Sequence, residues 1–162
     1  MVTGDDDASN TARPPTIDDL LRLCRELNAC SAKYLVIGGM AIIQHGFVRG
    51  TEDIDLLIDS SPENFEKVRA AMLTLPDGAV RDVEPGDLDK YIVVRVGDEF
   101  VIDLMRLACG IAYAEASEDA VIVTIRGVAI PFASPRMLLR LKQTYREKDA
   151  LDRAFLTRLL KN

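Results

Sequence analysis

A short segment of alternating acidic and apolar residues places the strongest constraint on the fold of this chain. Asp53 and Asp55 flank Ile54 and are followed by the apolar run Leu56-Leu57-Ile58. Residues two apart in a strand point to the same face, so the segment predicts a strand over 53–58 with both carboxylates on one face. The other face is apolar and belongs in a core. The fold must therefore bury one side of this strand and leave its acids accessible.

A third acid has the same setting. Asp103 lies between Ile102 and Leu104 in the apolar segment 100–105, which predicts a second strand. Three clustered carboxylates repel one another and resist desolvation unless a cation lies among them. Mg²⁺ suits such a cluster because it takes a few carboxylate oxygens together with substrate phosphates, and two such ions can act on one phosphoryl-type displacement. A solvated strand face is the alternative explanation for the acidic pair alone.

Two glycines follow another apolar segment. Residues 34–37 predict a buried strand, Gly38 and Gly39 follow it directly, and residues 41–46 predict a short helix. Without side chains, the glycine backbone N–H groups can come close to a phosphate at the start of a helix. The alternative is a tight turn with no ligand.

The rest of the chain predicts helices and strands without strict alternation. Helices are predicted over 17–28, from Ser61 to just before Pro76, and over 111–116, 135–145 and 149–160, and strands over 80–83, 91–96, 121–125 and 128–130. This order favours an α+β fold with a mixed sheet over a doubly wound parallel fold.

Length and composition limit the remaining possibilities. The 162 residues, 48% of them hydrophobic, suit one domain over residues 16–162, and the polar residues 1–15 predict a disordered leader. The sequence has no apolar run of about eighteen residues and no signal-peptide pattern, so we expect a cytoplasmic protein without a membrane partner. The three cysteines show no metal-ligand spacing, which favours buried reduced thiols.

Taken together, these motifs resemble the nucleotidyltransferase superfamily built on a polymerase-β-like palm. The resemblance rests on Gly38-Gly39, on Arg49-x-Thr51-x-Asp53-x-Asp55 and on Asp103, and covers roughly residues 17–160. The double glycine and the C-terminal motif Leu141-Lys142-x-x-Tyr145-Arg146-x-Lys148-Asp149-x-x-Asp152 resemble the AbiEii-like and minimal nucleotidyltransferases of bacterial toxin–antitoxin systems. The implied fold is a palm with flanking helices and a short C-terminal helical segment.

The resemblance also implies roles for single residues. Asp53 and Asp55 would hold Mg²⁺, and Asp103 would complete a second metal site and help to deprotonate the attacking hydroxyl. The remaining candidates would bind the nucleoside triphosphate (NTP) or support its site: Gly38, Gly39, Arg49, Thr51, Lys142 and Arg146. A solvated helix face is the alternative for the last two, which lie one helical turn apart.

The implied reaction transfers a nucleoside monophosphate from an NTP to an acceptor hydroxyl. Residues 135–162 carry a net charge of +5, which leaves −11 for residues 1–134 and suits an anionic acceptor such as tRNA. A toxin-like enzyme of this kind would have a cognate antitoxin protein as a possible partner. Two alternatives stay open, a small-molecule nucleotidyltransferase of the antibiotic-modifying type and a non-catalytic nucleotide-binding protein. The residues around Asp55 fit haloacid-dehalogenase-like phosphatases poorly. The chain is also shorter than glycosyltransferases with an Asp-x-Asp motif usually need.

Overall fold

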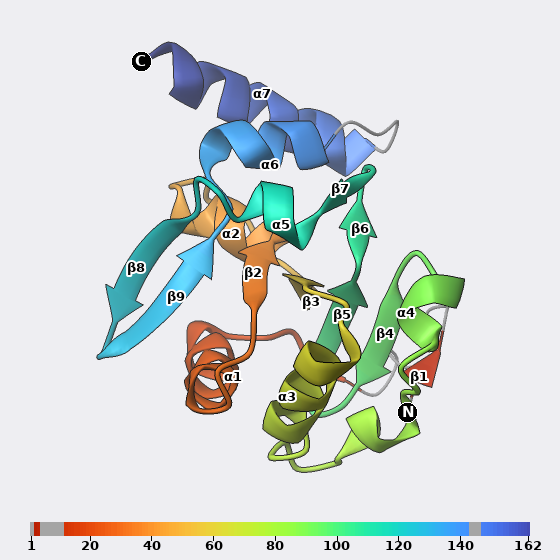
Figure 1. The fold of residues 1–162 in the computed structure, drawn as a ribbon. Helices are drawn as coiled ribbons and strands as arrows, with labels where there is room; N and C mark the ends of the chain where they lie inside the picture. Colours follow the sequence, from red (N-terminus) through yellow and green to blue (C-terminus); the bar gives the residue numbers. More distant parts are fainter. Residues whose placement is uncertain (1, 4–11, 143–146) are drawn as a thin grey trace.

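The computed structural model describes residues 2–3, 12–142 and 147–162 (Figure 1). Within these residues, seven strands form one mixed sheet in the order β1-β4-β5-β3-β2-β9-β8. They are β1 (Val2–Thr3), β2 (Tyr34–Ile37), β3 (Asp53–Ile58), β4 (Val94–Gly97), β5 (Val101–Met105), β8 (Val121–Ile125) and β9 (Val128–Phe132). A short separate ladder joins β6 (Leu107–Ala108) to β7 (Ile111–Ala112). The predicted α+β fold with a mixed sheet is confirmed.

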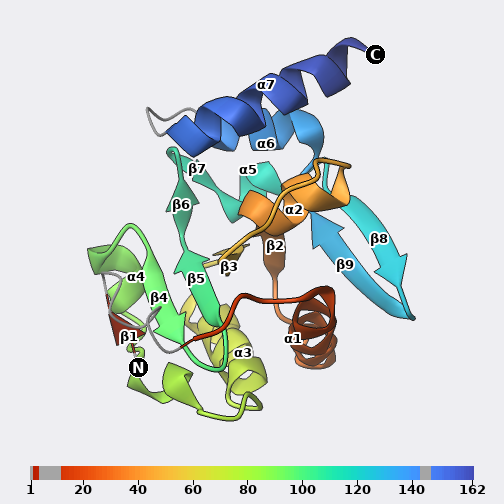
Figure 2. The ribbon, with the colours of Figure 1, turned by 180° about the vertical axis from the view of Figure 1, so that it is seen from behind.

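Two pairs of helices lie at opposite ends of the view (Figures 1 and 2). The helices are α1 (Ile17–Ala29), α2 (Gly38–Gln44), α3 (Pro62–Met72), α4 (Asp87–Lys90), α5 (Tyr113–Ala116), α6 (Pro135–Leu141) and α7 (Glu147–Lys161). Helices α1 and α3 pack against each other at one end, and α6 and α7 lie side by side at the other. In the part of the chain that the structure describes, no helix is both long and apolar enough to cross a membrane.

Helix α1 follows directly from its sequence signals. Thr16 caps the helix and forms a reciprocal capping box with Asp19, which satisfies backbone N–H groups that would otherwise lack partners. Leu20, Leu23 and Leu27 recur at helical spacing, and each is at most 1% exposed. The predicted boundaries 17–28 differ from the observed ones by one residue.

The central strands separate the core from the acids. Strand β3 pairs in parallel with β5, which places Ile54 beside Ile102 and Asp55 beside Asp103. Both isoleucines are fully buried. Because side chains alternate along each strand, the acids point to the face opposite these core residues. The sequence-based strand predictions over 53–58 and 100–105 are confirmed to within one residue.

The strand predicted over 91–96 is observed three residues later at its start, as β4 over Val94–Gly97, and two further segments differ in type from the prediction. Residues 80–83, predicted as a strand, instead belong mostly to a 3₁₀ turn over Ala79–Asp82, because Gly78 adopts a left-handed conformation and Asp98 accepts the Ala79 N–H. Residues 111–116, predicted as a helix, divide into strand β7 and the single helical turn α5. The local pattern of apolar residues did not distinguish a strand from a helix or a turn in these short segments.

The ends of the chain and the thiols complete the comparison. Of the predicted leader 1–15, residues 1 and 4–11 lie outside the described residues, and their disorder stays a prediction. The described part is in contact with the domain: Val2–Thr3 pair with β4 as strand β1, and Arg13 donates to Asp19 and Glu99. Helix α6 ends at Leu141 rather than at residue 145, and residues 143–146 lie outside the description. All three cysteines are reduced, but only Cys24 is buried, and Cys109 is exposed.

Candidate active site

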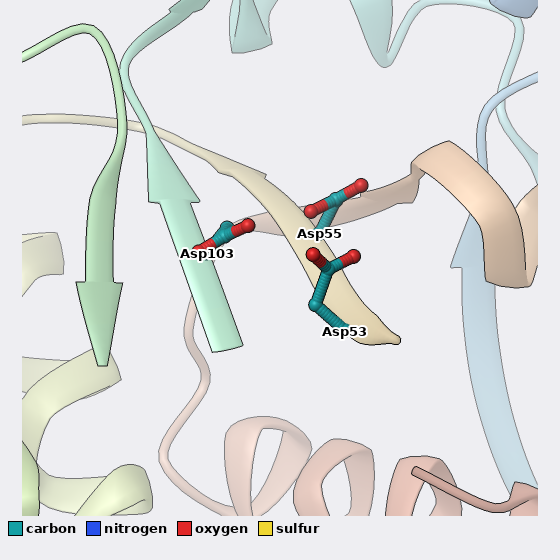
Figure 3. A group of neighbouring side chains, drawn as sticks. All are labelled: Asp53, Asp55 and Asp103. Carbon is teal, nitrogen blue, oxygen red and sulfur yellow. The ribbon is translucent and has the colours of Figure 1, made fainter. Parts of the chain in front are cut away.

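The three predicted acids meet on one face of the sheet. Asp53 and Asp55 come from β3 and Asp103 comes from the neighbouring strand β5 (Figure 3). One carboxylate oxygen of each lies within 4.8 Å of the others. This separation allows one cation to contact more than one of the acids, and the hard oxygen ligands are those that Mg²⁺ takes. The arrangement fits a divalent metal ion.

The surroundings of Asp55 in the cluster disfavour its ionised form. Burial raises the pKa of the Asp55 carboxyl well above its usual range, and the negative charges of Asp53 and Asp103 raise it further. The Lys142 ammonium acts in the opposite direction and lowers this pKa. A cation among the acids would favour the ionised form of Asp55, since it offsets both the repulsion and the lost hydration.

The glycine turn lies against this cluster. Ile37 at the end of β2 pairs with Asp55, so Gly38 follows beside that carboxylate. Gly38 has a φ of +69°, and a Cβ there would overlap the Asp55 side chain. At Gly39 a Cβ would come within 2.5 Å of Thr51 Oγ1. Both positions therefore require glycine on steric grounds. The two glycines also form the first turn of α2, so this helix begins at Gly38 rather than at the predicted residue 41.

A cleft of about 730 Å³ opens over the acids. Eight of the nine predicted site residues line it: Gly38, Gly39, Arg49, Thr51, Asp53, Asp55, Asp103 and Lys142. Thr51 donates its hydroxyl to the Asp53 carbonyl at 3.0 Å and so braces the start of β3. The ninth residue, Arg146, lies outside the described residues.

Arg95 also belongs to this site, and the sequence reasoning missed it. It lies on β4 directly opposite Asp103 in the antiparallel pairing with β5. Its Nε donates to Asp103 Oδ1 at 3.0 Å, and its Nη2 donates to Asp103 Oδ2 at 3.1 Å and to Asp53 Oδ2 at 3.3 Å. Alternation with the buried Val94 and Val96 indicates that Arg95 faces away from the core. Only the strand register shows that it meets the acids.

Lys142 and Arg49 line the cleft, and both side chains form ion pairs with acids of α7. Lys142 Nζ contacts Asp149 at 3.1 Å and Asp152 at 3.2 Å, both on α7. Arg49 Nη1 donates to the two carboxylate oxygens of Asp152 at 2.7 and 2.6 Å. The C-terminal motif contained both acids, but its spacing alone gave them no role. The structure makes them the partners of two cleft cations.

The comparisons with known proteins identify the fold. No family model and no curated protein matches the sequence. Among solved structures, the chain is similar to the crystal structure of an antigenic nucleotidyltransferase-like protein from Paracoccidioides brasiliensis, with a TM-score of 0.55 and 17% sequence identity. The alignment covers 98% of this chain and 79% of that one. The chain thus has a nucleotidyltransferase-like fold, with a carboxylate cluster and a glycine turn at one cleft.

Proposed function

We propose that this protein is a Mg²⁺-dependent nucleotidyltransferase that moves a nucleoside monophosphate from an NTP to an acceptor hydroxyl. One observation carries the proposal: three carboxylates from neighbouring strands lie within 4.8 Å of one another beside a glycine turn. Fold alone does not define activity, so the chemistry of this cluster supports the reaction type.

The carboxylates would hold the metal. Asp53, Asp55 and Asp103 would supply oxygen ligands on one wall of the cleft, and a second ion of the same kind is part of the proposal. Mg²⁺ bound there would neutralise charge on the transferring phosphoryl group and its leaving group. The protein side chains then mainly orient the substrate, since phosphoryl-type transfer needs little covalent chemistry from the protein.

The triphosphate would lie between the glycine turn and the cationic wall of the cleft. Gly38 and Gly39 line the cleft at the start of α2, where backbone N–H groups would meet a phosphate, and Arg49 and Lys142 line the same cleft. Arg95 brings a third positive charge to the acid cluster. We infer that these groups offset triphosphate charge at a site whose own acids would otherwise repel it.

We further propose a toxin-like enzyme of the AbiEii type that modifies tRNA, with a cognate antitoxin as its partner. The support is the C-terminal motif together with the net charge of +5 over residues 135–162. Arg158 and Lys161 are exposed in the last turn of α7 and could contact acceptor phosphates.

A small hydroxylated molecule is the second candidate acceptor. Several cations of the same segment are paired within the protein, Arg136 with Asp119, Arg140 with Glu115, and Lys142 with the acids of α7. This pairing reduces the charge available to an RNA backbone and favours an acceptor that needs few phosphate contacts.

The deciding experiment measures label transfer. Wild-type protein and Asp53→Asn are incubated with Mg²⁺, each labelled NTP in turn and total bacterial RNA, and the RNA is resolved on a gel. Asp18→Asn is the matched control, because Asp18 is exposed on α1 and pairs with the exposed Arg126.

Label in tRNA-sized RNA with wild type and Asp18→Asn, but not with Asp53→Asn, supports the proposed reaction and acceptor. No labelled RNA with any NTP rejects the tRNA acceptor, and small hydroxylated compounds then replace RNA in the same assay. NTP binding without transfer to either acceptor class would favour the non-catalytic nucleotide-binding alternative.

A further inference from the structure

Two acids of α7 are buried although they lie outside the carboxylate cluster. Asp149 is 0% and Asp152 is 1% exposed. They are three residues apart and so share one face of the helix. A buried carboxylate is costly unless it is paired and hydrogen-bonded, so the partners of these two indicate what they do.

Their partners are the two cations on the cleft wall. Asp152 accepts from Arg49 Nη1 at 2.6 and 2.7 Å and contacts Lys142 Nζ at 3.2 Å. Asp149 accepts from the same ammonium at 3.1 Å. Arg49 belongs to the segment between α2 and β3, and Lys142 caps the end of α6. Helix α7 therefore joins two separate parts of the cleft wall through one carboxylate.

The same two cations face the proposed triphosphate position. Arg49 Nη2 lies 3.5 Å from the point that a Cβ on Gly39 would occupy, so the guanidinium extends from Asp152 to the glycine turn. Lys142 lines the same cleft as Gly38, Gly39 and Arg49. Each cation thus has an α7 carboxylate on one side and the cleft on the other.

We propose that Asp152 is a positioning residue for triphosphate binding, which acts by fixing Arg49 and Lys142 against the cleft. The inference rests on the proposed function and extends it to α7. A long cationic side chain loses rotamer freedom when it binds an anion, and a buried carboxylate that already holds it removes much of that cost. The C-terminal helix is then part of the substrate site without contacting substrate.

The direction in which Asp152→Asn changes the triphosphate affinity distinguishes positioning from simple electrostatics. Replacing Asp152 with asparagine removes a negative charge near the cleft, and Coulomb's law alone predicts tighter anion binding. Positioning predicts the reverse, because the two cations lose their common anchor.

The test is calorimetric titration of the full-length protein with inorganic triphosphate in excess Mg²⁺. For Asp152→Asn we expect the Kd to rise about tenfold, the size expected when one charge-assisted hydrogen bond is lost. Asp18→Asn should bind as wild type does. A Kd for Asp152→Asn that is unchanged or lower overturns the inference, provided that circular dichroism shows the native fold.

A double mutant tests whether Asp152 acts through Arg49. In an Arg49→Gln background the Asp152→Asn change should lose the part of its effect on Kd that passes through Arg49 and keep the part that passes through Lys142, whereas an undiminished effect contradicts the inference. If Asp152→Asn does not fold, Arg49→Lys replaces it. That variant keeps the charge but not the guanidinium geometry, so several-fold weaker binding supports positioning and wild-type affinity rejects it.

The proposed function and this inference fail in different ways. If wild-type protein binds neither inorganic triphosphate nor any NTP, the triphosphate site itself is wrong and both fail. If wild type binds triphosphate and Asp152→Asn binds it equally well, only the positioning role of Asp152 is wrong.

Discussion

Arg95 and Asp103 face each other across β4 and β5, and the guanidinium donates to both oxygens of the carboxylate at 3.0 and 3.1 Å. The same guanidinium reaches Asp53 at 3.3 Å. The acid cluster therefore has a positive charge supplied by the protein itself. This charge offsets part of the repulsion that three neighbouring carboxylates create.

Removing that charge should destabilise the protein mainly when metal is absent. We expect Arg95→Gln to lower the free energy of unfolding by about 1–3 kcal/mol in the presence of a chelator, because two partly buried carboxylates lose their partner. Excess Mg²⁺ should recover part of this loss by neutralising the same acids. Denaturant unfolding in both buffers measures the difference, and an equal loss in both would show that Mg²⁺ does not bind at these acids.

The glycine turn should tolerate no side chain at Gly38. Alanine there combines a left-handed backbone, which costs about 1–2 kcal/mol, with a clash against Asp55. We expect Gly38→Ala to lose most Mn²⁺ binding and nucleotidyl transfer. Gly50→Ala is the control, since nothing lies within 4 Å of its added Cβ. Electron paramagnetic resonance of added Mn²⁺ gives a readout independent of activity, and full binding by Gly38→Ala would contradict the described turn.

Acid should weaken the start of α1. Hydrogen bonds from Arg13 hold the pKa of the Asp19 carboxyl below its ordinary value of 3.8, with further help from the Thr16 backbone and hydroxyl. A lowered folded-state pKa stabilises the protein at pH values above 3.8, and this stabilisation is lost as pH falls through the folded-state pKa.

Asp19→Asn removes this pH-dependent contribution. At neutral pH we expect the variant to be less stable by about 1 kcal/mol or more, through the lost cap and ion pair. Below the folded-state pKa the two proteins should converge. Urea unfolding across the acidic range measures the gap, and a gap that does not vary with pH would rule out ionised Asp19 as its source.

The cysteines should differ in reactivity. Burial raises the pKa of the Cys24 thiol to about 12, whereas Cys109 is exposed. Only the thiolate reacts, so a thiol reagent should modify Cys109 in the native protein and reach Cys24 only after unfolding. Peptide mass spectrometry locates the label, and Cys109→Ser should remove the fast reaction. Rapid native labelling of Cys24 would contradict its burial.

Periodicity alone determined much of this protein. The apolar stripe and Thr16 cap defined α1, and the alternation through residues 53–58 placed Asp53 and Asp55 on one face, because these signals are local to a helix or strand. The same local reasoning identified Asp103 and the two glycines, and motif resemblance added their expected roles and the palm-like fold. Local signals were too weak for the short turn over Ala79–Asp82, where a distant carboxylate from Asp98 fixes the backbone.

Only the tertiary structure decided which charges meet. The position of Arg95 opposite Asp103 depends on the register of β4 against β5, and a slip of one residue would turn its side chain to the other face. The contacts of Asp152 with Arg49 and Lys142 join residues far apart in the chain. Sequence spacing defines neighbours within one helix or strand, whereas pairing between elements depends on how their buried faces pack together.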